Sequence, residues 1–405
     1  GPEAGTGPGP LAGYRVLDLS QMLSGPMCCQ ILGDQGADVI KVEPLEGDLV
    51  RGMAKSMSPT FSVVNRNKRS IALDLKRPEG HALFRRLLGT ADVVVQNFRP
   101  GAAERLGVAY DQVRALRPAV VYLSISGFGE TGPYAGKRVY DPIIQAVSGL
   151  ASFQADEHGH PRMMRLIIPD KVTSLTAAQA VTAALLQRAR TGEGQHIRMS
   201  MLDAVMAFTW AEGMAAHTFV GGRAAGNDRR HAYYSRDLVY DVRDGFVTVG
   251  TNTMKEWRAL CAAFNKPEWL EDRRFQDGAG LVAFRDARMD MVQEHLRSMT
   301  STEALAVLDR HEVPCAPVHH PRERVLEDPQ VLANGSVLEA VHPLAGRMRF
   351  ARPAARFGHS SFEVRHHAPL IGEQTDDILS ELGTSADEIG KLREMGVLRR
   401  EPGLH

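Results

Sequence analysis

The first 130 residues alternate between buried strands and amphipathic helices, and this alternation is the strongest constraint on the fold. Residues 15–19 predict a buried strand, residues 27–37 a short helix and residues 38–43 a second strand. A strand, a helix and a strand within about 30 residues form a βαβ unit, which requires a parallel sheet with right-handed crossovers. Further strands and helices follow at 70–75, 78–88, 91–96, 114–117 and 119–126. We therefore predict an α/β fold with a large Rossmann-like domain that binds ligands at the carboxyl ends of its strands.

Composition then divides the chain into five predicted segments. The glycine- and proline-rich start contains Gly1-Pro2, which is typical of a protease cleavage remnant, so we expect this start to be disordered. A Gly/Arg-rich stretch without periodicity predicts a linker, and the hairpin pattern after it predicts a smaller α+β domain. The predicted segments are a disordered start (1–12), a large domain (13–205), a linker (206–232), a small domain (233–324) and a tail that returns to the large domain (325–405).

Charge and cysteine usage exclude several classes of protein. Forty-eight basic and 48 acidic residues cancel, which argues against a general nucleic-acid binder. No apolar run approaches the ~18 residues that span a bilayer, so we expect no membrane segment. Cys28, Cys29, Cys261 and Cys315 contain no CxxC pair. So few cysteines in a chain of 405 residues favour reduced thiols and a cytoplasmic location.

Residues 165–195 place one carboxylate in front of the longest predicted helix. An apolar run ends at Pro169, Asp170 follows, and apolar residues then recur at helical spacing until Gly192. Asp170 therefore lies at or near a helix N-terminus, where free N–H groups and the helix dipole favour its ionised form. The local pattern alone favours a plain helix cap, since this is the common role of Asp at such a position.

Four other patterns carry weaker signals. Gly127–Gly132 matches GxGxxG after a strand, but no apolar helix pattern follows, so a turn or a flexible loop over a ligand fits better than a nicotinamide site. Residues 156–160 and the pairs at 319–320 and 366–367 contain histidine, but they lack the spacing of a complete ligand set, so we predict no metal.

Basic side chains gather near the predicted strand ends. Any one of them could be a solvated surface residue, since Lys and Arg are mostly exposed. Together they could bind the phosphates of a cofactor. These residues are Arg66, Lys68, Arg69, Lys76, Arg99, Arg105 and Arg138.

The order of several longer motifs resembles one known family along nearly the whole chain. The chain is similar to the family III CoA-transferases, which include formyl-CoA transferase, carnitine CoA-transferase and the α-methylacyl-CoA racemases. The motifs that carry the resemblance are GYRVLDLSQMLSGP, ADVIKVEPLEGD, NRNKRSIALDLKRPEG, ADVVVQNFRPG, SISGFGETGPY, RARTGEGQHIRMSMLDA, HEVPCAPV and APLIGEQTDD.

This resemblance implies a mechanism and a set of site residues. Asp170 matches the family nucleophile, which attacks an acyl-CoA, passes through a mixed anhydride and an aspartyl-CoA thioester, and yields CoA to a second carboxylic acid. Coenzyme A is thus a substrate, with no metal and no nicotinamide. The family also implies two subunits that interlock as a homodimer. Contacts to CoA carry over to Leu73, Lys76, Asn97, Phe98 and Arg105, and we add Arg99 and Arg138 on charge grounds.

The sequence also departs from the family pattern at informative positions. Racemases of the family place a histidine directly before an aspartate, where this chain has Tyr140 and Asp141. A tyrosine of ordinary pKa is a poor proton carrier at neutral pH, which favours transfer over racemisation. Asp141 itself is also typical of a helix start. Leu23 replaces a glutamine of formyl-CoA transferase, and residues 217–250 lack its glycine-rich lid, so oxalate and formate are disfavoured. A racemase or a catalytically silent acyl-CoA-binding protein remain the alternatives.

Overall fold

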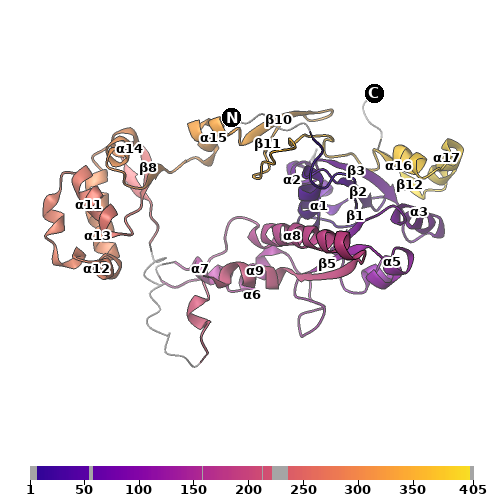
Figure 1. Ribbon diagram of the computed structural model, residues 1–405, viewed down its shortest axis with the longest axis horizontal. Helices are drawn as coiled ribbons and strands as arrows, with labels where there is room; N and C mark the ends of the chain where they lie inside the picture. Colours follow the sequence, from indigo (N-terminus) through magenta and orange to yellow (C-terminus); the bar gives the residue numbers. More distant parts are fainter. Residues whose placement is uncertain (1–6, 54–57, 157, 212, 221–235, 402–405) are drawn as a thin grey trace. The chain divides into compact units, whose positions relative to one another are not determined.

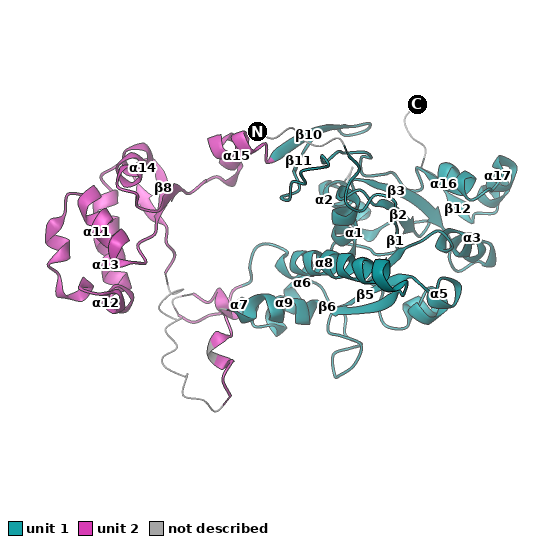
Figure 2. Ribbon diagram, viewed as in Figure 1, with its two compact units in different colours: residues 1–151, 163–212, 337–405 teal, residues 152–162, 213–336 magenta. Residues whose placement is uncertain are grey.

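The computed structural model describes most of the chain and divides into two compact units (Figure 2). Unit 1 comprises residues 1–151, 163–212 and 337–405, and unit 2 comprises residues 152–162 and 213–336. The residues that the structure describes are 7–53, 58–156, 158–211, 213–220 and 236–401.

Unit 1 is built on a seven-stranded sheet with the order β12-β3-β2-β1-β4-β5-β6 (Figure 1). Strands β1 to β6 pair in parallel, and β12 joins the edge of β3 antiparallel. The Rossmann-like α/β prediction is therefore confirmed. The strands are β1 (Arg15–Asp18), β2 (Asp38–Glu43), β3 (Lys68–Leu73), β4 (Val93–Gln96), β5 (Val121–Ser126), β6 (Gln195–Ser200) and β12 (Leu398–Arg399).

The strand order changes direction at β1. From β1 the chain moves outward through β2 and β3 on one side, and it returns to β4, β5 and β6 on the other. The loops that follow β1 and β4 therefore leave neighbouring strands in opposite directions. In open α/β sheets this switch point opens a crevice at the carboxyl ends of the strands, where ligands bind.

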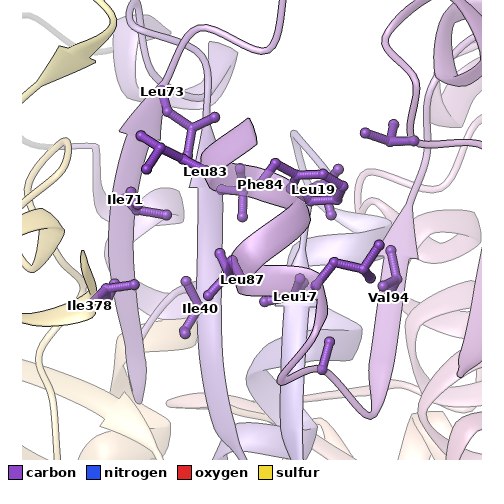
Figure 3. Close-up of a cluster of buried hydrophobic side chains, with 14 of the residues drawn as sticks. Leu17, Leu19, Ile40, Ile71, Leu73, Leu83, Phe84, Leu87, Val94 and Ile378 are labelled. Carbon is purple, nitrogen blue, oxygen red and sulfur yellow. The ribbon is translucent and has the colours of Figure 1, made fainter. Parts of the chain in front are cut away.

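Helices cover one face of the sheet around a large apolar core (Figure 3). Alternate strand residues such as Leu17, Ile40 and Ile71 point to this face and pack against Phe84 of α3 and Ile378 of α16. The core thus joins the first ninety residues to the C-terminal segment. The helices here are α3 (Pro78–Leu88), α4 (Ala102–Arg105), α5 (Tyr110–Leu116), α16 (Thr375–Glu381) and α17 (Ala386–Glu394).

Helix α1 and the longer helix α8 pack on the opposite face and on each other. Helices α6 and α9 pack against α8, and α2 packs against α1. The helices are α1 (Ser24–Asp34), α2 (Pro59–Val64), α6 (Asp141–Val147), α7 (Leu150–Phe153), α8 (Ile168–Thr191) and α9 (Met201–Trp210). A hairpin of β10 (Val337–His342) and β11 (Gly346–Ala351) completes unit 1.

Beneath α1 lies a cluster of fully buried charges, which we call the buried charge cluster and define as Asp18, Lys41, Asp48 and Lys68. The Lys68 Nζ lies 2.7 Å from Asp18 Oδ2, and it also donates to the carbonyl of Pro26 in α1 at 2.7 Å. The Lys41 Nζ lies 2.8 Å from Asp48 Oδ2. Burial alone would raise the pKa of Asp18, but the charges of Lys68 and Lys41 lower it to about 2.

The start of β3 corrects one prediction from the sequence. Arg66, Lys68 and Arg69 were grouped with cations that could bind phosphate, yet they lie at the amino end of this strand. Arg66 pairs with Asp34 at 2.6 Å, and Arg69 pairs with Asp38 at 2.7 Å. Because acidic side chains of neighbouring elements already neutralise them, these three cations are structural and hold the sheet and α1 together.

Unit 2 is a small α+β unit, as predicted. Its antiparallel sheet has the order β7-β8-β9, and its apolar core surrounds the fully buried Trp257. Its strands are β7 (Tyr240–Val242), β8 (Gly245–Val249) and β9 (Cys315–Pro317). Its α-helices are α11 (Met254–Ala263), α12 (Gly278–Ala283), α13 (Arg285–Leu296), α14 (Ser301–Arg310) and α15 (Pro329–Asn334).

The unit boundaries differ from the predicted segments in several places. Residues 7–12 pack on unit 1, because Leu11 is buried and its N–H donates to the carbonyl of Gln35; the expected disorder therefore does not apply to them. Residues 1–6 and the part of the predicted linker and lid region at 221–235 lie outside the described residues. Unit 1 resumes at residue 337 instead of 325. No helix in the described part of the chain is long and apolar enough to cross a membrane.

Candidate active site

The loop after β1 is fixed at the switch point by side chains from other elements. The Gln21 N–H donates to Asn97 Oδ1 at 2.9 Å, and Asn97 Nδ2 donates back to the Gln21 carbonyl at 2.7 Å. The next residue, Met22, has a positive φ of 68°, and its N–H donates to Asp48 Oδ1 at 3.1 Å. Asn97, predicted from the resemblance as a CoA contact, therefore joins the loops after β1 and β4.

Helix α1 starts directly after this loop and approaches it closely. A Cβ atom on Gly25 would lie 2.2 Å from Ser20 Cβ and 3.7 Å from Asn97 Cγ, so only glycine fits in the first turn. The first amides of a helix have no acceptor within the helix, and they carry the positive end of its dipole. The amides of Ser24 and Gly25 are thus available to a negative group at the switch point.

Asp170 supplies that negative group from the first turn of α8. Helix α8 leads from β5 back to the parallel strand β6, so its N-terminus lies at the carboxyl edge of the sheet. The hydroxyl and the backbone N–H of Ser24 lie beside the Asp170 carboxylate and lower its pKa. The Ser174 hydroxyl donates to the Ser24 carbonyl at 2.8 Å and fastens α8 to α1. Asp170 therefore binds the start of a second helix, α1.

Burial and a neighbouring charge set the basicity of this carboxylate. Burial raises the pKa of Asp170, the charge of Asp141 raises it further, and the hydrogen bonds from Ser24 lower it, with a net value of about 6. The group is thus mainly ionised at neutral pH but more basic than an ordinary aspartate. A partly buried, anionic oxygen beside free helix amides can act as a nucleophile without a separate base.

The second predicted carboxylate, Asp141, lies beside Asp170. It begins helix α6, as its sequence context indicates, and it is only 5 % exposed. Its Oδ2 accepts the Asp170 N–H at 3.2 Å, and its Oδ1 accepts Gln145 Nε2 at 2.6 Å. Burial raises the pKa of Asp141 above its usual range. Its neighbour Tyr140 is 61 % exposed at the N-cap of α6 and has no hydrogen bond to either carboxylate.

Metal-binding clusters are absent from the part of the chain that the structure describes. No three His, Cys, Asp or Glu side chains there could hold a metal ion together. Asp156 instead accepts the N–H groups of His158 and His160 within its own loop. The pairs His319–Asp328 and His367–Glu373 each lie at 3.0 Å.

Comparison with known proteins agrees with this geometry. Residues 11–375 match the family described as CoA-transferase family III. The chain belongs to this family. It is 32 % identical to the human succinyl-CoA:glutarate CoA-transferase, covering 96 % of this chain and 90 % of that protein. It is 31 % identical to a formyl-CoA:oxalate CoA-transferase of Rhodopseudomonas palustris, covering 96 % and 97 %. A CaiB/BaiF family protein from Brucella suis has a similar structure, with a TM-score of 0.79, 30 % identity and coverage of 93 % and 100 %.

The cations predicted to bind CoA in this family III enzyme follow three of the parallel strands, β3, β4 and β5. Lys76 follows β3, Arg99 and Arg105 follow β4, and Arg138 follows β5, so all four lie in connections that leave the carboxyl edge. All four are exposed, and none has an ion pair within the described residues. They differ in this respect from the neutralised cations at the start of β3.

The apolar residues predicted to contact CoA are less accessible. Leu73 is 1 % exposed, packs in the core and pairs through its backbone with Leu398 of β12. Phe98 is half-buried against the same core, and its N–H donates to Gln96 Oε1 at 2.7 Å. Of the two side chains, only that of Phe98 retains an accessible surface in this chain.

The glycine-rich segment after β5 forms turns, and no helix begins before Asp141. Gly129 and Gly132 have positive φ angles of 97° and 89°. A Cβ atom on Gly127 would lie 2.3 Å from Val139 Cγ1, so the two ends of the segment touch. This geometry agrees with the sequence-based interpretation of a loop without a nucleotide-binding helix.

Two residues of the site were not identified from the sequence. Ser24 binds Asp170, and its only local signal is a Ser-Gly-Pro helix start in the loop after the first strand. Gln145 contacts Asp141, and its signal is the spacing of four residues on one helix. Neither signal shows which distant element the side chain meets.

Proposed function

We propose that this family III enzyme transfers CoA from an acyl-CoA to a carboxylic acid through a covalent intermediate on Asp170. The observation that carries the proposal is the contact between the Asp170 carboxylate and Ser24 at the start of α1. This contact holds an anionic oxygen at the switch point of the sheet, beside amides that have no acceptor in their helix.

The reaction proceeds through balanced steps. One oxygen of Asp170 attacks the thioester carbonyl, the C–S bond breaks, and a mixed anhydride and the CoA thiolate result. The thiolate attacks the aspartyl carbonyl of the anhydride and releases the first acid as its carboxylate. The acceptor carboxylate then attacks the aspartyl-CoA thioester, and the released thiolate attacks the new acyl group and restores Asp170. The Gly25 amide in the first turn of α1, which has no acceptor within the helix, would stabilise the oxyanion of each addition.

The acceptor that fits best is a dicarboxylic acid longer than oxalate. Both named relatives act on dicarboxylic acids, glutarate in one case and oxalate in the other. Leu23, the residue directly before Ser24, is apolar where the resemblance places a glutamine in formyl-CoA transferase. An apolar neighbour suits the methylene chain of a longer acid better than two adjacent carboxylates.

Intact mass spectrometry tests the proposal directly. We expect incubation with succinyl-CoA, as the first of a panel of acyl-CoAs, to add the mass of CoA minus water to the protein. Hydroxylamine should convert the adduct to a hydroxamate that peptide mapping locates at Asp170. Adding glutarate should discharge the adduct faster than adding oxalate. If no acyl-CoA forms an adduct, but the α-carbon of a branched acyl-CoA exchanges with deuterium, the racemase alternative replaces the transferase.

The exposed cations after β3, β4 and β5 would bind the phosphates of CoA. We expect Lys76→Ala and Arg105→Ala each to raise KM for acyl-CoA about tenfold and to change kcat by less than about twofold, because phosphate binding is shared by ground and transition states. Steady-state kinetics at low salt measures both constants. Arg190→Ala, which removes an exposed cation from the last turn of α8, is the matched control. Equal KM values in all variants would refute this assignment.

A second copy of the chain completes the proposed enzyme. Helices α6, α8 and α9 pack together and leave large apolar side chains uncovered, among them Phe208 with 62 % exposed. Exposed apolar groups gathered on packed helices are typical of an interaction surface. The family resemblance supplies the expected occupant, a second subunit that interlocks with the first. The other exposed apolar residues of these helices are Ile143, Val147, Leu175 and Trp210.

A further inference from the structure

Helix α6 supplies two side chains that hold the start of α8. Asp141 and Gln145 lie one turn apart on the same face of α6, and both are buried. Asp141 Oδ2 accepts the N–H of Asp170, one of the first amides of α8, which have no acceptor in their own helix. Asp141 thus satisfies an orphan donor on the residue that carries the nucleophile.

Gln145 fixes the segment that leads into α8. Its Oε1 accepts the Met164 N–H at 2.9 Å, and its Nε2 lies 3.4 Å from the Met164 carbonyl and 3.3 Å from the Leu166 carbonyl. The same Nε2 donates to Asp141 Oδ1 at 2.6 Å. A buried amide with these partners allows one orientation of the Asp141 carboxylate, and it holds residues 164–170 in one conformation.

We propose that Asp141, oriented by Gln145, is a positioning residue that fixes Asp170 through its amide and, by its negative charge, favours the covalent state of Asp170 over the free carboxylate. This inference rests on the proposed function. It extends that function by assigning a role to the second, buried carboxylate beside the nucleophile.

The charge balance of the reaction explains the effect. Free Asp170 is an anion beside the Asp141 anion, and like charges in a partly buried site repel. When Asp170 attacks a thioester, its charge leaves with the CoA thiolate, and later with the released acid. The aspartyl-CoA state is therefore neutral at position 170, and forming it removes the repulsion. Ser24 from α1 and Lys171 from α8 are the other polar groups at this pair, and Lys171 stabilises the Asp141 anion.

Separate variants distinguish charge from position. Asp141→Asn removes the charge and retains an oxygen for the Asp170 amide, whereas Gln145→Met keeps the charge and removes the tether. Asp377→Asn is the matched control, because Asp377 is exposed on α16 and its side chain has no hydrogen bond or ion pair within the described residues.

The wild type should lose kcat/KM below about pH 6, where Asp170 takes up a proton. In Asp141→Asn we expect this acid limb to move down by about one pH unit, and the equilibrium ratio of aspartyl-CoA to free enzyme to fall about tenfold by intact mass. Gln145→Met should lower kcat about tenfold and leave the limb in place. Asp377→Asn should match the wild type in both measurements.

A second variant, for which the acid limb should shift in the opposite direction, keeps the test decisive if Asp141→Asn does not fold. Lys171→Met removes a partly exposed cation near the pair, so the acid limb should move to higher pH. If the limb stays at the wild-type pH in every folded variant of these two, the charge role is refuted and Asp141 is structural only. If the wild type itself forms no adduct, the proposed function fails instead, and the two failures are thus distinguishable.

Discussion

Replacing Asp170 with asparagine should abolish CoA transfer and at the same time make the protein more stable at neutral pH. The amide has no anionic oxygen to attack a thioester, so we expect kcat to fall by about 10⁴-fold or more, as when other covalent enzymes lose their nucleophile. The same substitution removes a buried charge that Asp141 repels. Activity and stability should therefore change in opposite directions.

The pH dependence of this stability gain follows from the raised pKa. Folding raises the pKa of Asp170 from 3.8 to about 6, chiefly through burial, so the unfolded chain releases this proton at lower pH than the folded protein. The stabilising contribution is complete below about pH 4 and is lost as the pH rises through about 6. The asparagine variant does not titrate at this position, so its stability does not fall in this pH range. Its free energy of unfolding should exceed that of the wild type by about 1–3 kcal/mol above pH 7, and the difference should vanish near pH 4.

Urea unfolding at pH 4.5, 6 and 7.5 measures this difference, with CoA transfer assayed on the same preparations. Asp377→Asn, which removes an exposed carboxylate on α16, should match the wild type at every pH. An equal stability gain at pH 4.5 and 7.5 would show that Asp170 is not a strained carboxylate. Transfer within tenfold of the wild type would refute the covalent mechanism.

Breaking the buried charge cluster should have the largest effect on folding. Lys68 is fully buried and donates hydrogen bonds to Asp18, Pro26 and Asn65 at 2.7 to 2.8 Å. Lys68→Met leaves the Asp18 carboxylate in an apolar interior with only Lys41 and Ser20 to balance it. We expect a loss of about 3–5 kcal/mol in the free energy of unfolding, because a buried charge without its partner is strongly unfavourable.

Chemical denaturation of Lys68→Met and of the double variant Asp18→Leu/Lys68→Met measures two different effects. The single variant gives the cost of leaving Asp18 without its partner, and the double variant gives the net contribution of the ion pair. The double variant should regain most of the lost stability, since an apolar pair can replace a buried ion pair at little loss. Lys391→Met, an exposed lysine on α17, is the matched control and should be neutral. If Lys68→Met unfolds at the same urea concentration as Lys391→Met, the cluster does not stabilise the sheet.

The sequence predicted the local elements of unit 1 well, because buried parallel strands and amphipathic helices have distinct apolar periods. The predicted helix at 78–88 coincides with α3, and the predicted strand at 38–43 coincides with β2. The apolar pattern did not predict the strand order or the edge strand β12, because strand pairing depends on contacts between distant residues. In unit 2 the pattern predicted the hairpin, which β7 and β8 form, but it did not predict that β9 pairs with β8.

The charged residues show more clearly that a local pattern does not reveal contacts between distant residues. Arg66, Lys68 and Arg69 have the composition of a phosphate site, but their acidic partners come from β1, α1 and β2, which are 30 to 50 residues away. For Asp170, local pattern indicated a helix start, and only the family resemblance indicated a nucleophile. Its contacts with Ser24 and Asp141 depend on how α1, α6 and α8 pack, and a single sequence does not encode that packing in any local signal.

The position of β12 has a consequence for co-translational folding. Leu398 pairs with Leu73, so the edge of β3 receives β12 only after residues 398–399 have emerged. At about 5–20 residues per second, this edge stays open on the order of tens of seconds, with its unpaired N–H and C=O groups facing outward. During that interval the open edge of β3 can pair with a neighbouring nascent chain.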